Sequence, residues 1–145
     1  MIKKSGFTLV ELLIVISVLG ILAAIVAPLY SDASEKTRTS TLQTDLQKIR
    51  TQIEVYRSQH NDQLPAFTGE SSTDFERRMT SKTDKNGNAS TDYGPYLNKI
   101  PKNPYNGNNT VRIDGTAAGA NTDGWRFDSL SGTFQADDSA DNALF

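Results

Sequence analysis

Glu11 is the residue whose type and place most need a chemical explanation. It lies four residues after Phe7, inside a run of mostly apolar side chains that continues to Leu29. A carboxylate in such a segment costs free energy when the segment enters a bilayer, and charges there usually mark a function and a partner. A glutamate near the end of the segment can also extend its side chain to the membrane surface. The residues alone leave both interpretations open.

Few other residues have the types and spacing that catalysis or metal binding requires. The single histidine, His60, follows a predicted helix, and we expect it to cap that helix at the surface. Asp84 begins a segment with the ligand spacing of a calcium-binding loop, but Ala89 and Pro95 stand where that loop needs glycine and glutamate. The sequence has no nucleophile elbow, zinc motif or phosphate-binding loop. We therefore expect no enzyme activity.

The composition describes one apolar element attached to a polar body. The chain has 145 residues, which is enough for one domain and an appendage. Its formal net charge is −2, and we expect no nucleic-acid binding because the chain has no excess of basic residues. It has no cysteine, which excludes a disulfide framework and thiol chemistry.

The N-terminal apolar segment has the length of a membrane-spanning helix. Residues 7–29 would extend about 34 Å as a helix, close to the ~30 Å thickness of a bilayer core. Lys3 and Lys4 precede the segment, and the positive-inside tendency places that end in the cytoplasm. We expect a single-pass protein of the inner (cytoplasmic) membrane, with its body on the far side. A secretory signal peptide cut near Ala27 and a plain anchor are the alternatives.

A second apolar pattern predicts that the helix continues beyond the membrane segment. The spacings of three and four residues place one apolar stripe on a helix face, made by Leu42, Leu46, Ile49, Ile53 and Tyr56. The predicted helix runs from about Phe7 to about His60, apolar in its first half and amphipathic in its second. We expect the stripe to pack on the body of the same chain; a short coiled coil is the alternative.

The rest of the chain predicts loops, a short helix and a small sheet, and hence an α+β fold. Residues 61–105 are rich in turn formers, and Thr73 with Glu76 forms a capping-box pattern that predicts a helix near 74–81. Alternating apolar residues predict three strands in a small antiparallel sheet, at 110–114, 125–128 and 133–136. The acidic end of the chain is expected to be mobile, although Leu144 and Phe145 could dock.

The stretch "SGFTLVELL" resembles the cleavage and methylation motif of type IV prepilins and of the pseudopilins of type II secretion. The resemblance implies that prepilin peptidase removes a leader, residues 1–6, by cutting between Gly6 and Phe7. Phe7 then becomes N-methylphenylalanine. The apolar segment, residues 7–30, stays in the mature protein as a membrane and filament-core helix. Residues 31–145 form the periplasmic or extracellular pilin-like domain.

The resemblance also gives Glu11 a role. Cleavage creates a cationic amine at Phe7, and in this family the glutamate of one subunit neutralises the amine of its neighbour, which sets the filament register. A buried ion pair of this kind acts as a register device more than as a source of stability. Gly20 and Pro28 are expected to let the helix bend or melt during assembly, because both weaken helical hydrogen bonding. An ordinary kink in a membrane helix is the alternative.

The implied partners are those of a filament subunit: other copies of the chain, prepilin peptidase, an inner-membrane assembly platform, minor pilins or pseudopilins, and membrane lipid before assembly. A major pseudopilin of type II secretion is the first expectation, because the body is small, Cys-free and ends in a β hairpin. A pilin of a surface pilus for adhesion, motility or DNA uptake is the alternative. A minor subunit at the tip is less favoured, because Glu11 would have no partner ahead of it. A membrane-anchored binding module is the alternative from another class.

Two features of the resembled families are not matched clearly. Many type IV pilins carry a C-terminal cysteine pair, which this chain lacks. Major pseudopilins bind calcium in their C-terminal loops, and this chain has aspartates in the same region, at 123, 128, 137, 138 and 141. A solvated acidic tail is the simpler interpretation. We expect no cofactor, and calcium is the one ion that the resemblance leaves open.

Overall fold

The computed structural model describes residues 6–145, and inside its first helix the side chains of residues 27–32 are not described. That helix, α1, comprises Leu9–Gln59 and is 51 residues long, as the sequence predicts. The chain divides into two compact units, one that ends at Thr37 and a second that comprises Arg38–Phe145. The predicted leader falls largely outside the described residues, and the predicted domain boundary after residue 30 stays a prediction.

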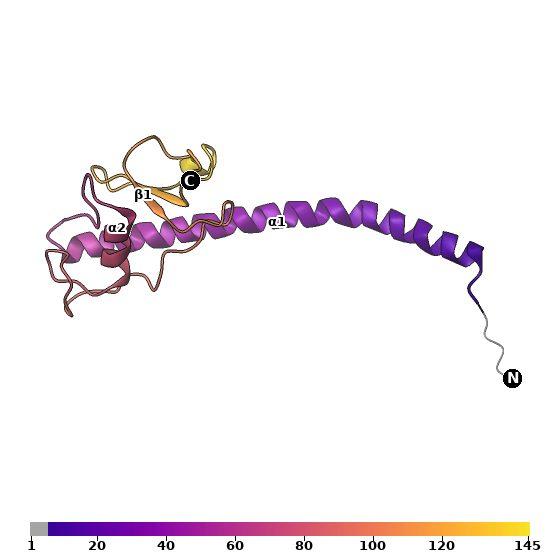
Figure 1. Cartoon of the computed structure of the whole chain (residues 1–145), viewed down its shortest axis with the longest axis horizontal. Coiled ribbons are helices and arrows are strands. Elements are labelled where there is room, and N and C mark those ends of the chain that lie inside the picture. Colours follow the sequence, from indigo (N-terminus) through magenta and orange to yellow (C-terminus); the bar gives the residue numbers. More distant parts are fainter. Residues whose placement is uncertain (1–5) are drawn as a thin grey trace. The chain divides into compact units, whose positions relative to one another are not determined.

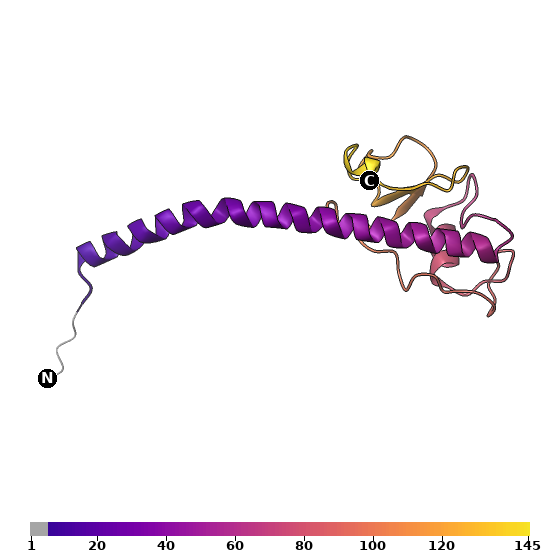
Figure 2. The same cartoon turned by 180° about the vertical axis from the view of Figure 1, so that it is seen from behind.

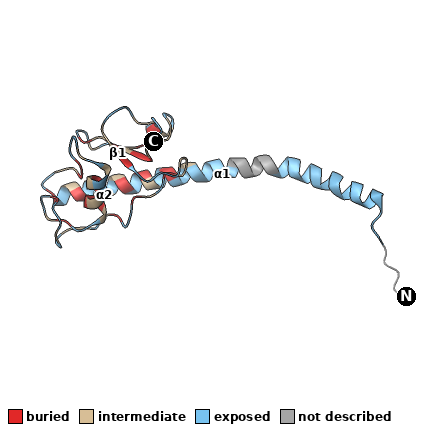
Figure 3. Cartoon of the chain, in the orientation of Figure 1, coloured by how far each residue is buried: buried red, intermediate tan, exposed pale blue. Residues whose placement is uncertain are grey.

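In the first unit, α1 presents apolar side chains on all its sides. The segment Leu9–Val26 has a mean hydropathy of 2.9 and none of it is buried, so it is long and apolar enough to cross a membrane. Figure 3 shows this part of the helix in the colour of exposed residues. Its one hydroxyl between Leu9 and Val26, that of Ser17, donates to the main-chain oxygen of Leu13 at 2.7 Å. Such an apolar surface needs a cover of lipid or protein.

In the second unit, α1 contributes one wall of the hydrophobic core. The predicted stripe is confirmed, because each of its five residues is at most 1% exposed: Leu42, Leu46, Ile49, Ile53 and Tyr56. Figures 1 and 2 show α2 and the strands on the flanks of this part of the helix, and Figure 3 shows its buried residues in red. The periodicity of the sequence therefore identifies both the helix and the face that it buries.

The prediction that His60 is a surface cap is wrong. His60 is fully buried, and its ring stacks on that of Tyr56 with the centroids 3.7 Å apart. Its Nδ1 lies 2.8 Å from the main-chain oxygen of Tyr56, and its Nε2 lies 2.9 Å from Oγ1 of Thr83. Both ring nitrogens thus have partners, which makes burial of the polar ring tolerable. Asn61 follows with a φ of +54°, a left-handed conformation that asparagine tolerates, and the backbone leaves the helical path there.

The second helix, α2, comprises Ser72–Thr80 and begins two residues before its predicted start. The predicted cap at Thr73 is wrong, because Ser71 takes that position. Oδ2 of Asp74 accepts hydrogen bonds from the main-chain nitrogen and the hydroxyl of Ser71, at 3.0 and 2.7 Å. The chain contains both overlapping capping patterns, and the structure uses the one made by Ser71 and Asp74. Phe75 is fully buried on the sheet side of the core, together with Met79.

Three short strands form one sheet in the order β1-β2-β3, with β1 at Val111–Ile113, β2 at Trp125–Phe127 and β3 at Phe134–Ala136. The β2–β3 hairpin is antiparallel, as predicted. The prediction of an all-antiparallel sheet is wrong, because β1 pairs with β2 in parallel. A parallel pair needs a crossover connection, and residues 114–124 suffice because strands of three residues are only about 10 Å long.

The sheet has one buried face and one face covered by its own loop. The buried side chains pack against α1 and α2: Val111, Trp125, Phe127, Phe134 and Ala136. The ring of Phe75 in α2 lies 5.0 Å from that of Phe127, and Trp125 lies 5.6 Å from Phe134. The alternating residues on the other face are Arg112, Arg126 and Gln135, which stand opposite one another in the strand register.

The acidic end of the chain is docked rather than free. A short 3-10 helix, η1, comprises Asn142–Leu144, and its Ala143 is buried. The main-chain oxygen of Ala143 accepts a hydrogen bond from the Gln135 side chain at 2.9 Å. The expectation of a mobile end is therefore wrong, although Leu144, which could have docked, is 86% exposed. Main-chain contacts, more than apolar side chains, hold this end in place.

Core packing on α1 predicts a sharp contrast between two neighbouring residues. Ile53→Ala should lower the free energy of unfolding by about 2–5 kcal/mol, because it leaves a cavity in a closely packed core. Val55→Ala, at an exposed position of the same helix, should change it by only about 0.5 kcal/mol. Urea unfolding of the full chain in detergent, followed by the fluorescence of the single Trp125, measures both. Equal losses would contradict the assignment of the buried face.

The burial of Tyr56 predicts a loss of stability at alkaline pH. Burial raises the pKa of Tyr56 to about 12, with smaller opposing effects from the nearby Arg78 and Arg77. The unfolded chain releases this proton near pH 10, so the stabilising contribution is complete below about pH 10 and is lost as the pH rises toward 12. The urea midpoint should therefore fall between pH 9 and pH 11, roughly, and fall less in Tyr56→Phe. An identical pH dependence in both proteins would contradict this account.

Candidate functional site

The predicted cleavage site lies in exposed, non-helical chain just before α1. Gly6, Phe7 and Thr8 are all exposed and precede the first helical residue, Leu9. The helix therefore begins two residues after its predicted start at Phe7. A peptidase must bind its substrate in an extended form, and the Gly6–Phe7 bond is free of helical hydrogen bonds. The geometry suits cleavage at the predicted bond.

Glu11 forms a capping box with Thr8 at the start of the helix. Its Oε2 accepts hydrogen bonds from the main-chain nitrogen and the hydroxyl of Thr8, both at 2.9 Å. In return, the main-chain nitrogen of Glu11 donates to Oγ1 of Thr8 at 3.2 Å. These contacts satisfy N–H groups that have no partner in the first turn of a helix. Glu11 therefore has a role within its own chain, in addition to the one that the resemblance implies.

An apolar contact completes this helix start. Phe7, just before the cap, lines one shallow apolar depression together with Leu12 and Val15. An apolar residue before the cap that packs on the fourth helical residue is a hydrophobic staple, and Phe7 and Leu12 hold those two positions. The first residue of the predicted mature chain thus lies against the helix that follows it.

The sequence contained a signal for this cap that the sequence analysis did not use. Thr8 and Glu11 form the pattern Thr-x-x-Glu, just before an apolar run. Thr73 and Glu76 form the same pattern, but the structure caps α2 with Ser71 and Asp74 instead. One oxygen of Glu11, Oε1, accepts no hydrogen bond from the described residues.

The glycines of this region are not required by the fold of the single chain. A Cβ built on Gly6 or on Gly20 would meet no other atom within 4 Å. The processing role predicted for Gly6 and the flexibility predicted for Gly20 stay predictions. Pro28 lies among the residues whose side chains are not described, and the flexibility predicted for it stays a prediction.

The acidic residues of the C-terminal region do not form a solvated tail. Asp137 is fully buried, and Asp128 closes the β2–β3 turn by accepting the N–H groups of Leu130 and Ser131. These hydrogen bonds, of which those from Ser131 have the largest effect, lower the pKa of Asp128 to about 2. Over residues 6–145, where placement is described, no group of three or more histidine, aspartate or glutamate side chains is arranged to hold a metal ion.

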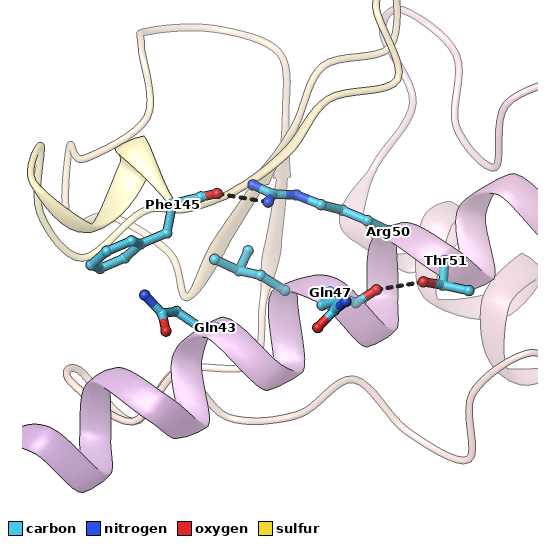
Figure 4. Close-up of a pocket in the computed structure, with 6 residues that line it drawn as sticks. Gln43, Gln47, Arg50, Thr51 and Phe145 are labelled. Carbon is cyan, nitrogen blue, oxygen red and sulfur yellow. Dashed lines mark hydrogen bonds between the residues drawn. The ribbon is translucent and has the colours of Figure 1, made fainter.

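A pocket on α1 offers no catalytic chemistry. It is lined by Gln43, Leu46, Gln47, Arg50, Thr51 and Phe145 (Figure 4). Arg50 is committed to the fold, because its Nε donates to the main-chain oxygen of Phe134 at 2.9 Å and its Nη1 to that of Phe145 at 2.7 Å. Thr51 donates to the main-chain oxygen of Gln47 within the helix. The lining holds neither an acid–base pair nor an activated nucleophile.

Comparisons with known proteins found one matching family model and several related sequences. Residues 1–27 match the model of the prokaryotic N-terminal methylation motif. The chain is 46% identical over 54 residues to the fimbrial protein EcpB of Eikenella corrodens and 38% identical over 73 residues to the type IV major alpha-pilin of Moraxella bovis. The chain is thus similar to type IV pilins, the family whose cleavage and methylation motif its N-terminal stretch resembles.

The similarity is confined to part of each protein. The two matches cover 37% and 50% of this chain, and 34% and 45% of the respective relatives. The type IV major fimbrial protein FimA of Dichelobacter nodosus is 40% identical over 52 residues, or 36% of this chain and 33% of its own. This chain therefore spans less than half the length of these relatives in each match. No solved structure matches the chain.

The capping box predicts a local effect of the Thr8 hydroxyl. Thr8→Val should weaken the helix start by about 0.5–2 kcal/mol, because it removes the side-chain oxygen that caps the first turn. In the uncut chain in detergent micelles, the amides of Val10 to Leu12 should then exchange hydrogen roughly fivefold faster. The control is Thr51→Val, the same chemical change inside the helix. Unchanged exchange in Thr8→Val would contradict the cap.

Proposed function

We propose that this chain is a member of the type IV pilin family and a structural subunit of a filament. It is made as a membrane-anchored precursor, cut after Gly6 and N-methylated at Phe7. The observation that carries the proposal is the arrangement at the start of α1. An exposed, non-helical Gly6–Phe7 bond is followed within one turn by Glu11, on a helix half that is apolar on all sides.

The apolar half of α1 explains why the subunit needs two successive environments. Its side chains are exposed in the single chain, and the match to the prokaryotic N-terminal methylation motif covers the same segment. Before assembly, lipid covers it as a single-pass helix with the N-terminus in the cytoplasm and the body on the periplasmic side. After assembly, the corresponding helices of other copies cover it. Prepilin peptidase, an inner-membrane assembly platform and minor subunits are the partners that this path requires.

Cleavage changes the electrostatics of the helix start. Water adds across the Gly6–Phe7 amide, which leaves a carboxylate on Gly6 and an ammonium group on Phe7. In methylation, the neutral amine takes the methyl group of a sulfonium donor, whose C–S bond breaks, and one N–H proton is released; the product is an amine that can still be protonated. The Glu11 carboxylate, whose Oε1 is unused by the described residues, then pairs with the amine of a neighbouring copy. The pair fixes the axial register, because either charge alone would be costly in the filament core.

A surface pilus is the filament that the relatives support best. The matched proteins are named as fimbrial proteins and major type IV pilins. A pseudopilus of type II secretion is the second candidate, favoured by the small Cys-free body that ends in the β2–β3 hairpin. Shearing separates the two candidates: a surface pilus is released into the medium, whereas a pseudopilus stays in the envelope and its loss stops protein secretion.

Processing predicts a defined N-terminus in native cells. Mass spectrometry of the N-terminal peptide should find a chain that begins at Phe7 and carries one added methyl group. The same protein made in cells without prepilin peptidase should begin at Met1 or Ile2. A mature chain cut near Ala27, or an uncut chain in cells with active peptidase, would overturn the proposal.

Two substitutions separate the charge of Glu11 from its capping role. Glu11→Gln keeps an acceptor for the capping box but removes the charge, so processing should continue while sheared filaments fall by at least about tenfold, the effect of about 1.4 kcal/mol per subunit contact. Thr8→Val loses the cap but keeps the charge, and assembly should persist. Glu54→Gln, at an exposed position of α1, is the control. Normal filaments from Glu11→Gln would show that the charge has no role in register.

A further inference from the structure

We propose that the guanidinium of Arg112 serves as the built-in cation of the β1–β2 loop, so that residues 114–124 keep their fold without a divalent metal ion. The proposal concerns the body of the chain and is independent of the filament assignment. It bears on calcium, the one ion that the resemblance leaves open, because the residues present do not fit that ion.

The guanidinium lies in a cage of oxygen atoms from the loop and from the residue after β3. Its Nη1 donates to the main-chain oxygens of Asp114 and Thr116, both at 2.8 Å. Its Nη2 donates to Oδ1 of Asp137 at 2.6 Å and, more weakly, to the main-chain oxygen of Ala117 at 3.4 Å. Main-chain carbonyls and carboxylates are the ligands that calcium prefers. Here one side chain supplies the positive charge.

Asp137 has no coordination capacity left for a metal ion. Besides Arg112, it accepts hydrogen bonds from the main-chain nitrogens of Gly119, Ala120 and Asp123 and from the Thr122 hydroxyl, at 3.1–3.3 Å. Burial acts to raise the pKa of Asp137, but the hydrogen bonds from Arg112 and the loop outweigh it and the pKa lies below its ordinary value. The buried carboxylate is therefore ionised and fully partnered.

The alternation of side chains along β1 determines the face on which the Arg112 guanidinium lies. Arg112 is the middle residue of β1 and points to the face opposite the core, next to Arg126 of β2. Like charges opposite each other on neighbouring strands repel unless acceptors lie between them. Arg126 donates to the same Thr116 oxygen at 2.9 Å and pairs with Asp128 at 3.1 Å. A divalent ion at this place would add to two guanidinium charges, which is a further reason why calcium does not fit.

The test is the thermal unfolding of the full chain in detergent, followed by Trp125 fluorescence. For the natural sequence, the midpoint should be the same in EDTA and in millimolar calcium chloride. A fall of the midpoint in EDTA, or a rise in calcium, would overturn the proposal. The buried Trp125 lies in β2, next to the loop, so it reports on this region.

Substitutions at position 112 test whether the charge matters. Arg112→Gln should lower the midpoint by roughly 10 °C, because it leaves Asp137 buried without its cation. Arg112→Lys keeps a charge of similar reach, so its midpoint should lie clearly above that of Arg112→Gln. The control, Arg57→Gln, breaks exposed pairs with Glu54 and Asp62 and should shift the midpoint by only a few degrees. Equal losses for lysine and glutamine at position 112 would show that the charge is not what holds the loop.

Discussion

The buried face of α1 is the constraint on which the folded body depends. The stripe from Leu42 to Tyr56 forms one wall of the core, and the sheet and α2 supply the other walls. Three strands of three residues each could not bury enough apolar surface alone, since small units expose a large fraction of what they could bury. The second half of α1 therefore supplies part of the core of the body. The first half of the same helix is apolar on all sides and takes no part in that core. One continuous helix must satisfy two environments, and its sequence changes from apolar on all sides to a single stripe.

Glu11 illustrates how one carboxylate can serve two states of the same chain. In the uncut chain it caps the helix through Thr8, and this satisfies N–H groups that have no partner in the first turn of a helix. In the proposed filament the same carboxylate meets the amine of another copy. The capping bonds use one oxygen and leave the other for that partner. The local role and the proposed intermolecular role are therefore compatible.

Much of the fold could be predicted from periodicity, and most of the misses concern pairings that local patterns do not encode. The long helix and the three strands follow from local patterns of apolar residues. The parallel pairing of β1 with β2 does not, because alternation within a strand carries no information on its direction. The burial of His60 and the partners of Arg112 depend on residues far along the chain, such as Thr83 and Asp137, which only the fold brings near. The cap at Thr8 was local, and its pattern was available in the sequence.

The way in which the β1–β2 loop is held has a consequence for sequence divergence. Arg112 and Arg126 grip it through the main-chain oxygens of residues 114, 116 and 117, and those atoms are present whatever the side chains are. Thr116 and Ala117 are exposed and can be exchanged without loss of these anchors. Gly119 cannot, because a Cβ there would lie 2.6 Å from the nitrogen of Ala140. The exposed side chains of this loop can therefore change during evolution while its backbone conformation is kept.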